Sequence, residues 1–359
     1  MKHWQELGQI LERVLRLARA GQPAALATVT GIRGSAYRRP GARLLIEPDG
    51  AALGGVSGGC LEEDVREAGL QVLRTGTARV LHYETGGDDT NVWGLGLGCD
   101  GAVDIAVQAI TPEDALGVWA RVREMLGGEA PFAIALRVVA GGGGHVMLVG
   151  ESGRLAGGLD DAGAEVQAIE AATAAVRARR AGARATGPGT FFEALLPPPK
   201  LLVCGAGDDA RPLVAAAATV GFRVLVADHR AAYATGERFP QAHAVVLARP
   251  EDASAEPPAD ARTCAVVMTH SLKRDAEWVR RLAATDVPYI GVLGPRARTE
   301  RIVAGLPASA TDRVFGPVGL DLGAEGPEQV ALSILAEVLA VTAGREPRHL
   351  RERAVPVHA

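Results

Sequence analysis

The spacing of apolar residues predicts a chain in which helices and strands alternate. Several segments repeat apolar side chains at the spacing of one helical face, and shorter apolar runs between turn residues are typical of strands. The helical pattern covers residues 3–20, 61–75, 113–126, 164–181, 273–285, 296–305 and 327–343, and a further helix ends at Val220. Strands are expected over 26–30, 42–46, 51–56, 78–83, 102–110, 131–139, 145–150, 201–204, 223–227, 243–248, 264–269 and 289–293.

A run of three prolines, 197–199, divides the chain, because proline can continue neither a helix nor a central strand. We therefore expect an N-terminal domain over 1–196, a second domain over 197–344 and a tail over 345–359. Strands and helices alternate after the prolines as they do in an open parallel sheet. The predicted fold class is α/β: a small N-terminal α/β domain followed by a Rossmann-like domain with a mainly parallel sheet.

The segment GGVSGGCLEED, residues 54–64, joins a predicted strand to a predicted helix and contains Ser57, Gly58, Gly59 and Cys60. The glycines allow a tight turn and a close approach to a ligand. Cys60 would then lie at a helix N-terminus, where unpaired backbone N–H groups favour an anion. A thiolate there is a soft ligand for metals and sulfur. The alternative is a small buried cysteine with a packing role.

A second cysteine, Cys99, lies in a polar, glycine-rich segment over 84–101 that also holds Asp88, Asp89 and Trp93. The two aspartates fit either a metal site or the capping of a turn. Asp100 places a negative charge beside Cys99, which disfavours a thiolate there. Cys60 is therefore the better candidate for a reactive sulfur.

Arginines gather in the loop over 31–41, which contains Arg33, Arg38 and Arg39. Guanidinium groups bind phosphate through two parallel hydrogen bonds, so the loop suits an anion site. Solvated surface arginines would give the same pattern, and the sequence leaves both interpretations open.

The second domain opens with a dinucleotide-binding fingerprint. A strand is followed by Gly205 and Gly207, then by a helix, a second strand and Asp228. Such glycines bring a phosphate to the helix N-terminus, and the acid accepts from a ribose hydroxyl. Asp208 and Asp209 stand at the helix start, where their charge would oppose a phosphate.

His270 follows a predicted strand, at the end where such sheets bind ligands. A structural histidine fits the same place. Cys204 and Cys264 lie within apolar strands, and we expect both in the core.

Composition narrows the class of protein. The 359 residues carry a net charge of −4 without a large basic block, which argues against a nucleic-acid binder. No apolar stretch approaches the ~20 residues of a membrane span. The four cysteines form no CxxC pair, so neither a zinc ribbon nor a disulfide framework is expected, and a reducing cytoplasm fits best.

Taken together, these segments resemble the XdhC/CoxI family, whose members are maturation factors for xanthine dehydrogenase and related molybdenum hydroxylases. The resemblance covers nearly the whole chain, with motifs in the same order. The motifs are GGVSGGCLE (54–62), DDTNVWGLGLGCDG (88–101), PPPKLLVCGAG (197–207), RFP (238–240), VVMTH (266–270), YIGVLG (289–294) and GLDLGAEGPEQVALSILAEVLA (319–340).

The resemblance implies a cytoplasmic chaperone, not an enzyme, that binds the molybdenum cofactor as molybdopterin or a nucleotide derivative. It would shelter the cofactor while a cysteine desulfurase supplies a sulfido ligand, and then deliver it to an apo molybdenum hydroxylase. A homodimer is also implied. No acid–base or nucleophilic triad is recognisable in the sequence, which suits a carrier.

Onto the matching motifs, the resemblance carries Cys60 as the leading cofactor and metal ligand and Cys99 as the second. It places Ser57, Gly58, Gly59, Asp89 and Trp93 beside them, and it places Gly205 and Gly207 against the nucleotide or phosphate part of the cofactor. Asp228 and His270 complete the candidate set.

Two other functions fit parts of the sequence. The fingerprint with Asp228 fits an NAD(P)-dependent oxidoreductase, against which stand Asp208, Asp209 and the lack of a proton donor other than His270. A scaffold that only recruits the desulfurase and the apo-enzyme is the third hypothesis.

Overall fold

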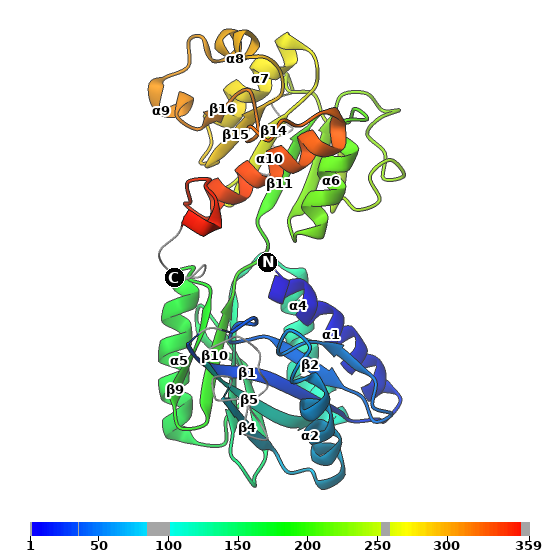
Figure 1. Ribbon diagram of the computed structural model, residues 1–359, viewed down its shortest axis with the longest axis vertical. Helices are drawn as coiled ribbons and strands as arrows, with labels where there is room; N and C mark the ends of the chain where they lie inside the picture. The colour runs from blue at the N-terminus through cyan, green and yellow to red at the C-terminus, as the bar shows by residue number, and fades with distance from the viewer. Residues whose placement is uncertain (1, 35, 85–100, 253–258, 353–359) are drawn as a thin grey trace. The chain divides into compact units, whose positions relative to one another are not determined.

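In the residues that the structure describes, three β-sheets form the framework, two before the triple proline and one after it. The computed structural model describes residues 2–34, 36–84, 101–252 and 259–352. The chain separates into two compact units, Met1–Pro197 and Pro198–Ala359 (Figure 1). Each unit has its own hydrophobic clusters and is described by itself.

The N-terminal unit contains two five-stranded sheets in which neighbouring strands are antiparallel. Sheet A has the order β3-β2-β1-β5-β4 and sheet B the order β8-β7-β6-β10-β9. The strands of sheet A are β1 (Ala24–Gly34), β2 (Arg43–Ile46), β3 (Ala52–Gly54), β4 (Arg79–Glu84) and β5 (Gly101–Ile110). Those of sheet B are β6 (Phe132–Val138), β7 (Gly144–Gly150), β8 (Gly153–Gly157), β9 (Gly182–Gly187) and β10 (Thr190–Leu195).

Helices cover both sheets of this unit. They are α1 (Lys2–Arg19), α2 (Glu62–Thr75), α3 (Pro112–Asp114), a π-helix η1 (Ala115–Trp119), α4 (Ala120–Gly127) and α5 (Ala162–Arg177). One face of each sheet shares a core with α1, η1 and α4. The opposite faces pack against α2 on sheet A and α5 on sheet B (Figure 1). Among the described residues, the unit therefore has one central core, two outer ones and a small cluster of Ala78, Ala106 and Val138.

The C-terminal unit is a parallel sheet C with the order β13-β12-β11-β14-β15-β16. Its strands are β11 (Lys200–Cys204), β12 (Arg223–Asp228), β13 (Ala244–Leu247), β14 (Thr263–Val267), β15 (Tyr289–Val292) and β16 (Val314–Phe315). Its helices are α6 (Ala210–Thr219), α7 (Leu272–Ala283), α8 (Arg296–Val303), α9 (Ala308–Thr311) and α10 (Gly326–Thr342), with a 3₁₀ turn at Leu350–Glu352.

Successive strand residues point to opposite faces of sheet C, so each central strand contributes to two cores. Leu201 and Val203 pack with α6 and α10, whereas Leu202 and Cys204 pack with α7. Both faces of the sheet are covered, which explains why the strands read as continuous apolar runs in the sequence.

The predicted fold class is confirmed, and the element boundaries need several corrections. The helix expected over 113–126 is interrupted by η1, because its backbone widens to π geometry. Residues 31–34, expected in a loop, extend β1, where they pair with β5. The sequence pattern does not predict the short strands β8 and β9 or the buried strand β10, because their residues show no clear alternation of apolar and polar side chains.

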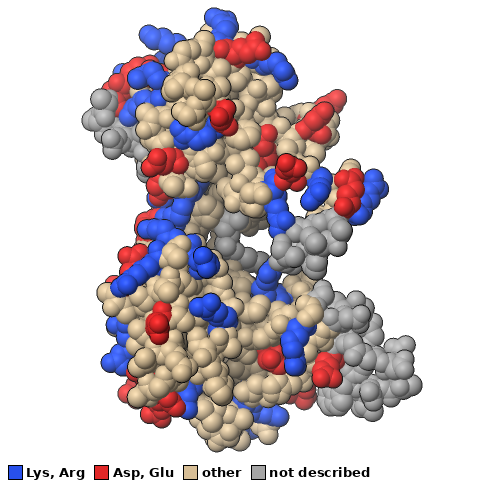
Figure 2. Space-filling view, turned by 90° about the vertical axis from the view of Figure 1, so that its left-hand side faces the viewer, with Lys and Arg blue, Asp and Glu red and all other residues tan. Residues whose placement is uncertain are grey.

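On the face shown in Figure 2, Lys and Arg are interspersed with Asp and Glu over both units. In the part of the chain that the structure describes, no helix has the length and apolar character needed to cross a membrane.

A buried ion pair connects the two sheets of the N-terminal unit. Arg43 of β2 is 2% exposed, and its Nη1 lies 2.7 Å from Oε2 of Glu193 on β10. The other Glu193 oxygen lies 2.9 Å from Nδ1 of His3. Burial alone would raise the pKa of Glu193, but the Arg43 charge and the His3 contact hold it below its ordinary value.

Removing one partner of this ion pair should lower the unfolding free energy far more than replacing both partners. Glu193→Ala leaves a buried guanidinium without its counter-charge, and we expect a loss of about 3–5 kcal/mol in unfolding free energy. The double variant Arg43→Met, Glu193→Leu should lie close to the wild type, because no charge remains buried. Urea unfolding of the three proteins measures the difference. Equal destabilisation of the single and double variants would contradict the assignment.

Candidate functional site

Cys60 lies on the cysteine turn, which we define as residues 55–61 between β3 and α2. Its thiol is exposed, whereas Cys204 and Cys264 are buried as the sequence predicted, and all three are free. Burial raises the pKa of the Cys264 thiol to about 12, and it raises that of Cys204 as well. Among the described cysteines, only Cys60 is placed to meet a ligand from solvent.

The backbone of the cysteine turn is held by the hydroxyl of Ser57. Its Oγ accepts the backbone N–H groups of Gly59, Cys60 and Leu61, each at 3.1 Å. The Cys60 sulfur lies 3.4 Å from the same oxygen. The N–H groups that the sequence pattern left free for an anion are therefore occupied in part by a serine side chain, which fixes the loop in one shape.

Glu62, which the sequence pattern did not single out, completes this network. One of its carboxylate oxygens accepts the Ser57 N–H at 2.8 Å and the Val56 N–H at 3.2 Å, and the other accepts the Ser57 hydroxyl. Burial alone would raise the pKa of Glu62, but these hydrogen bonds hold it below its ordinary value. The carboxylate therefore stays charged at neutral pH and keeps the serine oriented as an acceptor.

Glycines allow the backbone of the cysteine turn to pack closely against sheet A. Gly54 has φ +97°, and a Cβ there would lie 2.3 Å from the Arg43 carbonyl oxygen. That same oxygen accepts the Gly55 N–H at 2.8 Å. The ring of Tyr37, 76% exposed, packs over Gly58, where a Cβ would lie 3.5 Å from it. The exposed thiol consequently shares its surface with an exposed aromatic ring.

The segment over 31–41, in which the sequence places Arg33, Arg38 and Arg39, offers less positive charge to a ligand than its sequence indicated. Arg38 is half-buried, and its Nη2 donates to both carboxylate oxygens of Glu6 at 2.6 Å. Arg33 and Arg39 are exposed. The segment over 31–41 therefore combines one structural arginine, Arg38, with two on the surface, of which Arg33 lies at the end of β1.

The cysteine turn lies towards the Gly101 end of β5. The hydroxyl of Tyr83 on β4 donates to Asp64 in the first turn of α2, and Tyr83 pairs with Val103 of β5. Cys99, Asp88, Asp89 and Trp93 lie outside the described residues, so their relation to Cys60 stays a prediction. In the ranges that are described, no group of three or more His, Cys, Asp or Glu is arranged to hold a metal ion.

In the C-terminal unit, the glycine turn is closed by Asp228. Gly205 has φ +126°, and a Cβ there would lie 2.5 Å from the Met268 carbonyl oxygen. One Asp228 oxygen accepts the Ala206 N–H at 2.7 Å, and both oxygens accept from Arg230. Despite burial, these hydrogen bonds lower the pKa of Asp228 to about 2. Both oxygens of the acid thus already have donors within the chain.

The acids at the start of α6 also have partners. Asp209 Oδ2 lies 2.8 Å from Nε2 of His270, and Asp208 Oδ1 accepts from Arg238 Nη2 at 2.8 Å. A Cβ on Gly207 would lie 2.5 Å from the Asp209 carboxylate and 3.9 Å from the His270 ring. The structure thus brings Gly207 and His270 together, with an acid occupying the space beside them.

Comparisons with known proteins agree over most of the chain. Residues 17–84 match the XdhC and CoxI family, and residues 201–338 match the XdhC Rossmann domain. A protein of Bacillus subtilis (strain 168), named as a probable subunit of xanthine dehydrogenase, is 32% identical over 318 residues, which cover 89% of this chain and 93% of that protein.

Two further relatives match over more than nine-tenths of both chains. The molybdenum cofactor insertion chaperone PaoD of Escherichia coli (strain K12) is 24% identical over 360 residues, which cover 96% of this chain and 94% of that one. A crystal structure described as a xanthine dehydrogenase from Bacillus halodurans superposes with a TM-score of 0.78 and 27% identity, covering 94% of this chain and 96% of that one. The match to the XdhC and CoxI family, over residues 17–84, includes the whole cysteine turn.

Two neighbouring glutamates provide a matched test of the cysteine turn. We expect Glu62→Gln to lower the unfolding free energy by about 1–2 kcal/mol at pH 7, because a charged acceptor of three hydrogen bonds is lost. Glu63→Gln should leave it almost unchanged, because the pairing of Glu63 with Arg66 is exposed to solvent.

The pH dependence has a definite sign. The folded pKa of Glu62 lies below the unfolded pKa of 4.5. Its contribution to the unfolding free energy is therefore complete above the unfolded pKa, and it is lost as the pH falls through the folded pKa. Urea unfolding from pH 7 to pH 3 should therefore show a smaller loss on acidification for Glu62→Gln than for the wild type. If the unfolding free energies of the Glu62 and Glu63 variants changed identically with pH, the hydrogen bonds assigned to Glu62 would be contradicted.

Proposed function

Since this chain belongs to the XdhC and CoxI family, we propose that it is a carrier that binds the molybdenum cofactor and delivers it to a xanthine dehydrogenase-type hydroxylase. In this proposal the cofactor is cargo: it is held while a sulfido ligand is installed and is then released. The relatives named for xanthine dehydrogenase and for cofactor insertion support the assignment. The chain itself performs no redox turnover in this scheme.

The exposed thiol of Cys60 on a fixed turn is the observation on which the proposal rests. A thiolate is a soft donor that suits both molybdenum and a transferable sulfur atom. The described alternatives, Cys204 and Cys264, are buried in sheet C, and their raised thiol pKa values make them inert. A sulfur ligand supplied by the described part of the chain would therefore come from Cys60.

The residues around the turn suit the rest of an anionic, metal-bearing pterin. Ser57, Gly58 and Gly59 present backbone beside the thiol, and the Tyr37 ring offers a flat apolar surface for a heterocycle. The exposed arginines Arg33 and Arg39 carry charge of the sign that a phosphate requires. Cys99, Asp89 and Trp93 are proposed to complete the site from the segment that joins β4 to β5.

The pairing of acids in the C-terminal unit favours a carrier over a dehydrogenase. A dinucleotide needs a free phosphate position at the start of α6 and a free acid for its ribose. Asp209 is paired with His270, and Asp228 with Ala206 and Arg230. We therefore propose that Gly205, Gly207, Asp228 and His270 meet part of the cargo only after these contacts rearrange.

The partners follow from the chemistry of the cargo. A sulfido ligand requires a sulfur donor, for which we propose a cysteine desulfurase, and the loaded cofactor requires an apo molybdenum hydroxylase as acceptor. We further propose that the chain works in a reducing cytoplasm, where Cys60 stays a thiol, and that it forms a homodimer.

Replacing the sulfur of Cys60 should strongly reduce retention of the cargo. In a host that makes the molybdenum cofactor, we expect purified Cys60→Ser to hold at least about tenfold less molybdenum and pterin per chain than the wild type, the loss of roughly 1.4 kcal/mol or more of binding. Metal analysis and pterin fluorescence after oxidation measure the two components separately.

Cys264→Ala is the control, because it also removes a sulfur but from a buried position. It should retain the wild-type content of metal and pterin. The melting temperature of Cys60→Ser should equal that of the wild type, since the thiol is exposed. Undiminished molybdenum in Cys60→Ser would remove this thiol from the mechanism.

A further inference from the structure

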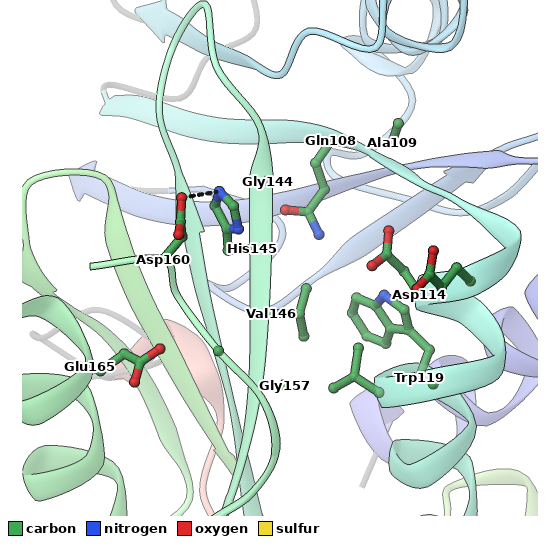
Figure 3. Close-up of a pocket in the computed structure, with 14 residues that line it drawn as sticks. Gln108, Ala109, Asp114, Trp119, Gly144, His145, Val146, Gly157, Asp160 and Glu165 are labelled. Atoms are coloured by element: carbon green, nitrogen blue, oxygen red, sulfur yellow. Dashed lines mark ion pairs between the residues drawn. The ribbon is translucent and has the colours of Figure 1, made fainter. Parts of the chain in front are cut away.

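Charge decides which hollow of the N-terminal unit suits an anionic cargo. A cavity of about 640 Å³ has Gln108 of β5, Gly144 of β7 and Trp119 of η1 in its wall (Figure 3). Asp114 and Asp160 stand on opposite sides of it in that view, and none of the described residues that line it is Lys or Arg. A phosphate-bearing ligand would meet repulsion there. The groups that hold the proposed cargo are therefore expected around the cysteine turn.

Glu6 of α1 lies between two segments that border the cysteine turn. Nη2 of Arg38 donates to both carboxylate oxygens of Glu6 at 2.6 Å. Oε1 of Glu6 also lies against Gly54, the last residue of β3, where a Cβ would be 3.2 Å from it. The carboxylate therefore connects the segment over 31–41 to the strand that leads into the cysteine turn.

The ion pair between Glu6 and Arg38 is sheltered from water. The side chain of Glu6 is 15% exposed and that of Arg38 is 11% exposed. Nε of Arg38 is buried and has no hydrogen-bond partner among the described residues. A guanidinium that loses its counter-charge in such a place is driven towards solvent. Loss of the Glu6 charge should therefore displace Arg38 and the backbone on either side of it.

The position of α1 does not depend on the cysteine turn. Leu7, Ile10 and Leu11 are at most 1% exposed and pack in the central core. Nε1 of Trp4 donates to the Leu126 carbonyl of α4 at 3.1 Å. The helix is thus a fixed support, to which Glu6 attaches Arg38.

Tyr37, the residue before Arg38, is the side chain that this attachment places. Its ring is 76% exposed and packs over Gly58 of the cysteine turn, where a Cβ would lie 3.5 Å from the ring. A side chain with so much of its surface in water has few contacts of its own to hold it. The position of the ring therefore follows that of Arg38.

We propose that Glu6 and Arg38 are positioning residues, which hold the Tyr37 ring against the cysteine turn and so shape the surface beside the Cys60 thiol. The contacts run from the buried face of α1 through the ion pair to Tyr37 and then to Gly58. The consequence for cargo rests on the proposed function, whereas the effect on the cysteine turn can be measured without cargo.

The rate of alkylation of Cys60 in cofactor-free protein tests the positioning. We expect Glu6→Gln to raise the rate of labelling by iodoacetamide at least about threefold, because a displaced Tyr37 no longer limits access to the turn. Peptide mass spectrometry gives the rate at Cys60 alone.

Glu47→Gln is the matched control, because it breaks another ion pair between α1 and sheet A. Nε of Arg13 lies 2.5 Å from Oε1 of Glu47, which is 5% exposed. Glu47 lies roughly 10 Å along the chain from Leu44, the residue that pairs with Gly54. The control should lower the melting temperature and label Cys60 at the wild-type rate. A rate in Glu6→Gln no faster than in Glu47→Gln would overturn the proposal.

Substitutions of Arg38 give a second, independent comparison. Both contacts to Glu6 come from a single nitrogen, so the ammonium of Arg38→Lys can take its place, whereas Arg38→Met keeps the apolar stem and removes the charge. We expect the wild-type labelling rate in the lysine variant and the faster rate in the methionine variant. Equal rates in these two variants would overturn the proposal.

Retention of molybdenum separates this inference from the proposed function. In a host that makes the cofactor, Glu6→Gln and Tyr37→Ala should each hold at least about fivefold less molybdenum per chain than the wild type. The double variant should hold as much as Tyr37→Ala, because Glu6 acts through Tyr37.

The two failures look different. Wild-type protein without molybdenum would overturn the proposed function and leave the labelling rates to decide the positioning. Molybdenum that is lost in Cys60→Ser but kept in Glu6→Gln and Tyr37→Ala would overturn this inference alone.

Discussion

The hydroxyl of Ser57 holds the backbone of the cysteine turn, because three consecutive N–H groups converge on this one oxygen. Glu62 fixes the hydroxyl in turn, because its carboxylate accepts the hydrogen bond that the Ser57 O–H donates. Few side chains can replace this pair, since the serine must donate once and accept repeatedly. The consequence is a turn that is rigid in its backbone and still presents the Cys60 sulfur to solvent. The carrier role that we propose requires this combination, because in that proposal the ligand is reached by two different partners.

The sequence predicts where the elements around Cys60 lie, but it does not predict the hydrogen bonds that hold the cysteine turn. The position of Cys60 between a strand and a helix follows from apolar spacing and glycines, and the parallel sheet follows from the alternation after the triple proline. The hydrogen bonds of Ser57 could not be predicted in the same way, since they depend on the path of the loop. Glu62 reads as an ordinary first-turn acid, although its reach back to Ser57 resembles a capping box.

The cavity beside Gln108 shows why tertiary contacts limit such predictions. Gln108 belongs to a strand that pairs with β1, whereas Gly144 belongs to the other sheet. The glycine run over 141–144 reads as a hairpin loop, and only the packing of the two sheets gives Gly144 its role against Gln108. The π geometry at Trp119 is equally invisible, because residues 113–126 have an uninterrupted helical pattern. Both features arise from contacts between segments that are distant in the sequence.

The reactivity of the Cys60 sulfur towards an alkylating reagent shows whether this thiol meets the cofactor. The chain is isolated with its molybdenum cofactor, one half is stripped of cofactor, and both are treated with iodoacetamide. Peptide mass spectrometry then gives the rate at Cys60. We expect loading to slow this rate at least about tenfold, because the bound cofactor covers or ligates the thiolate. Equal rates in loaded and stripped protein, with molybdenum still bound to the loaded sample, would contradict it.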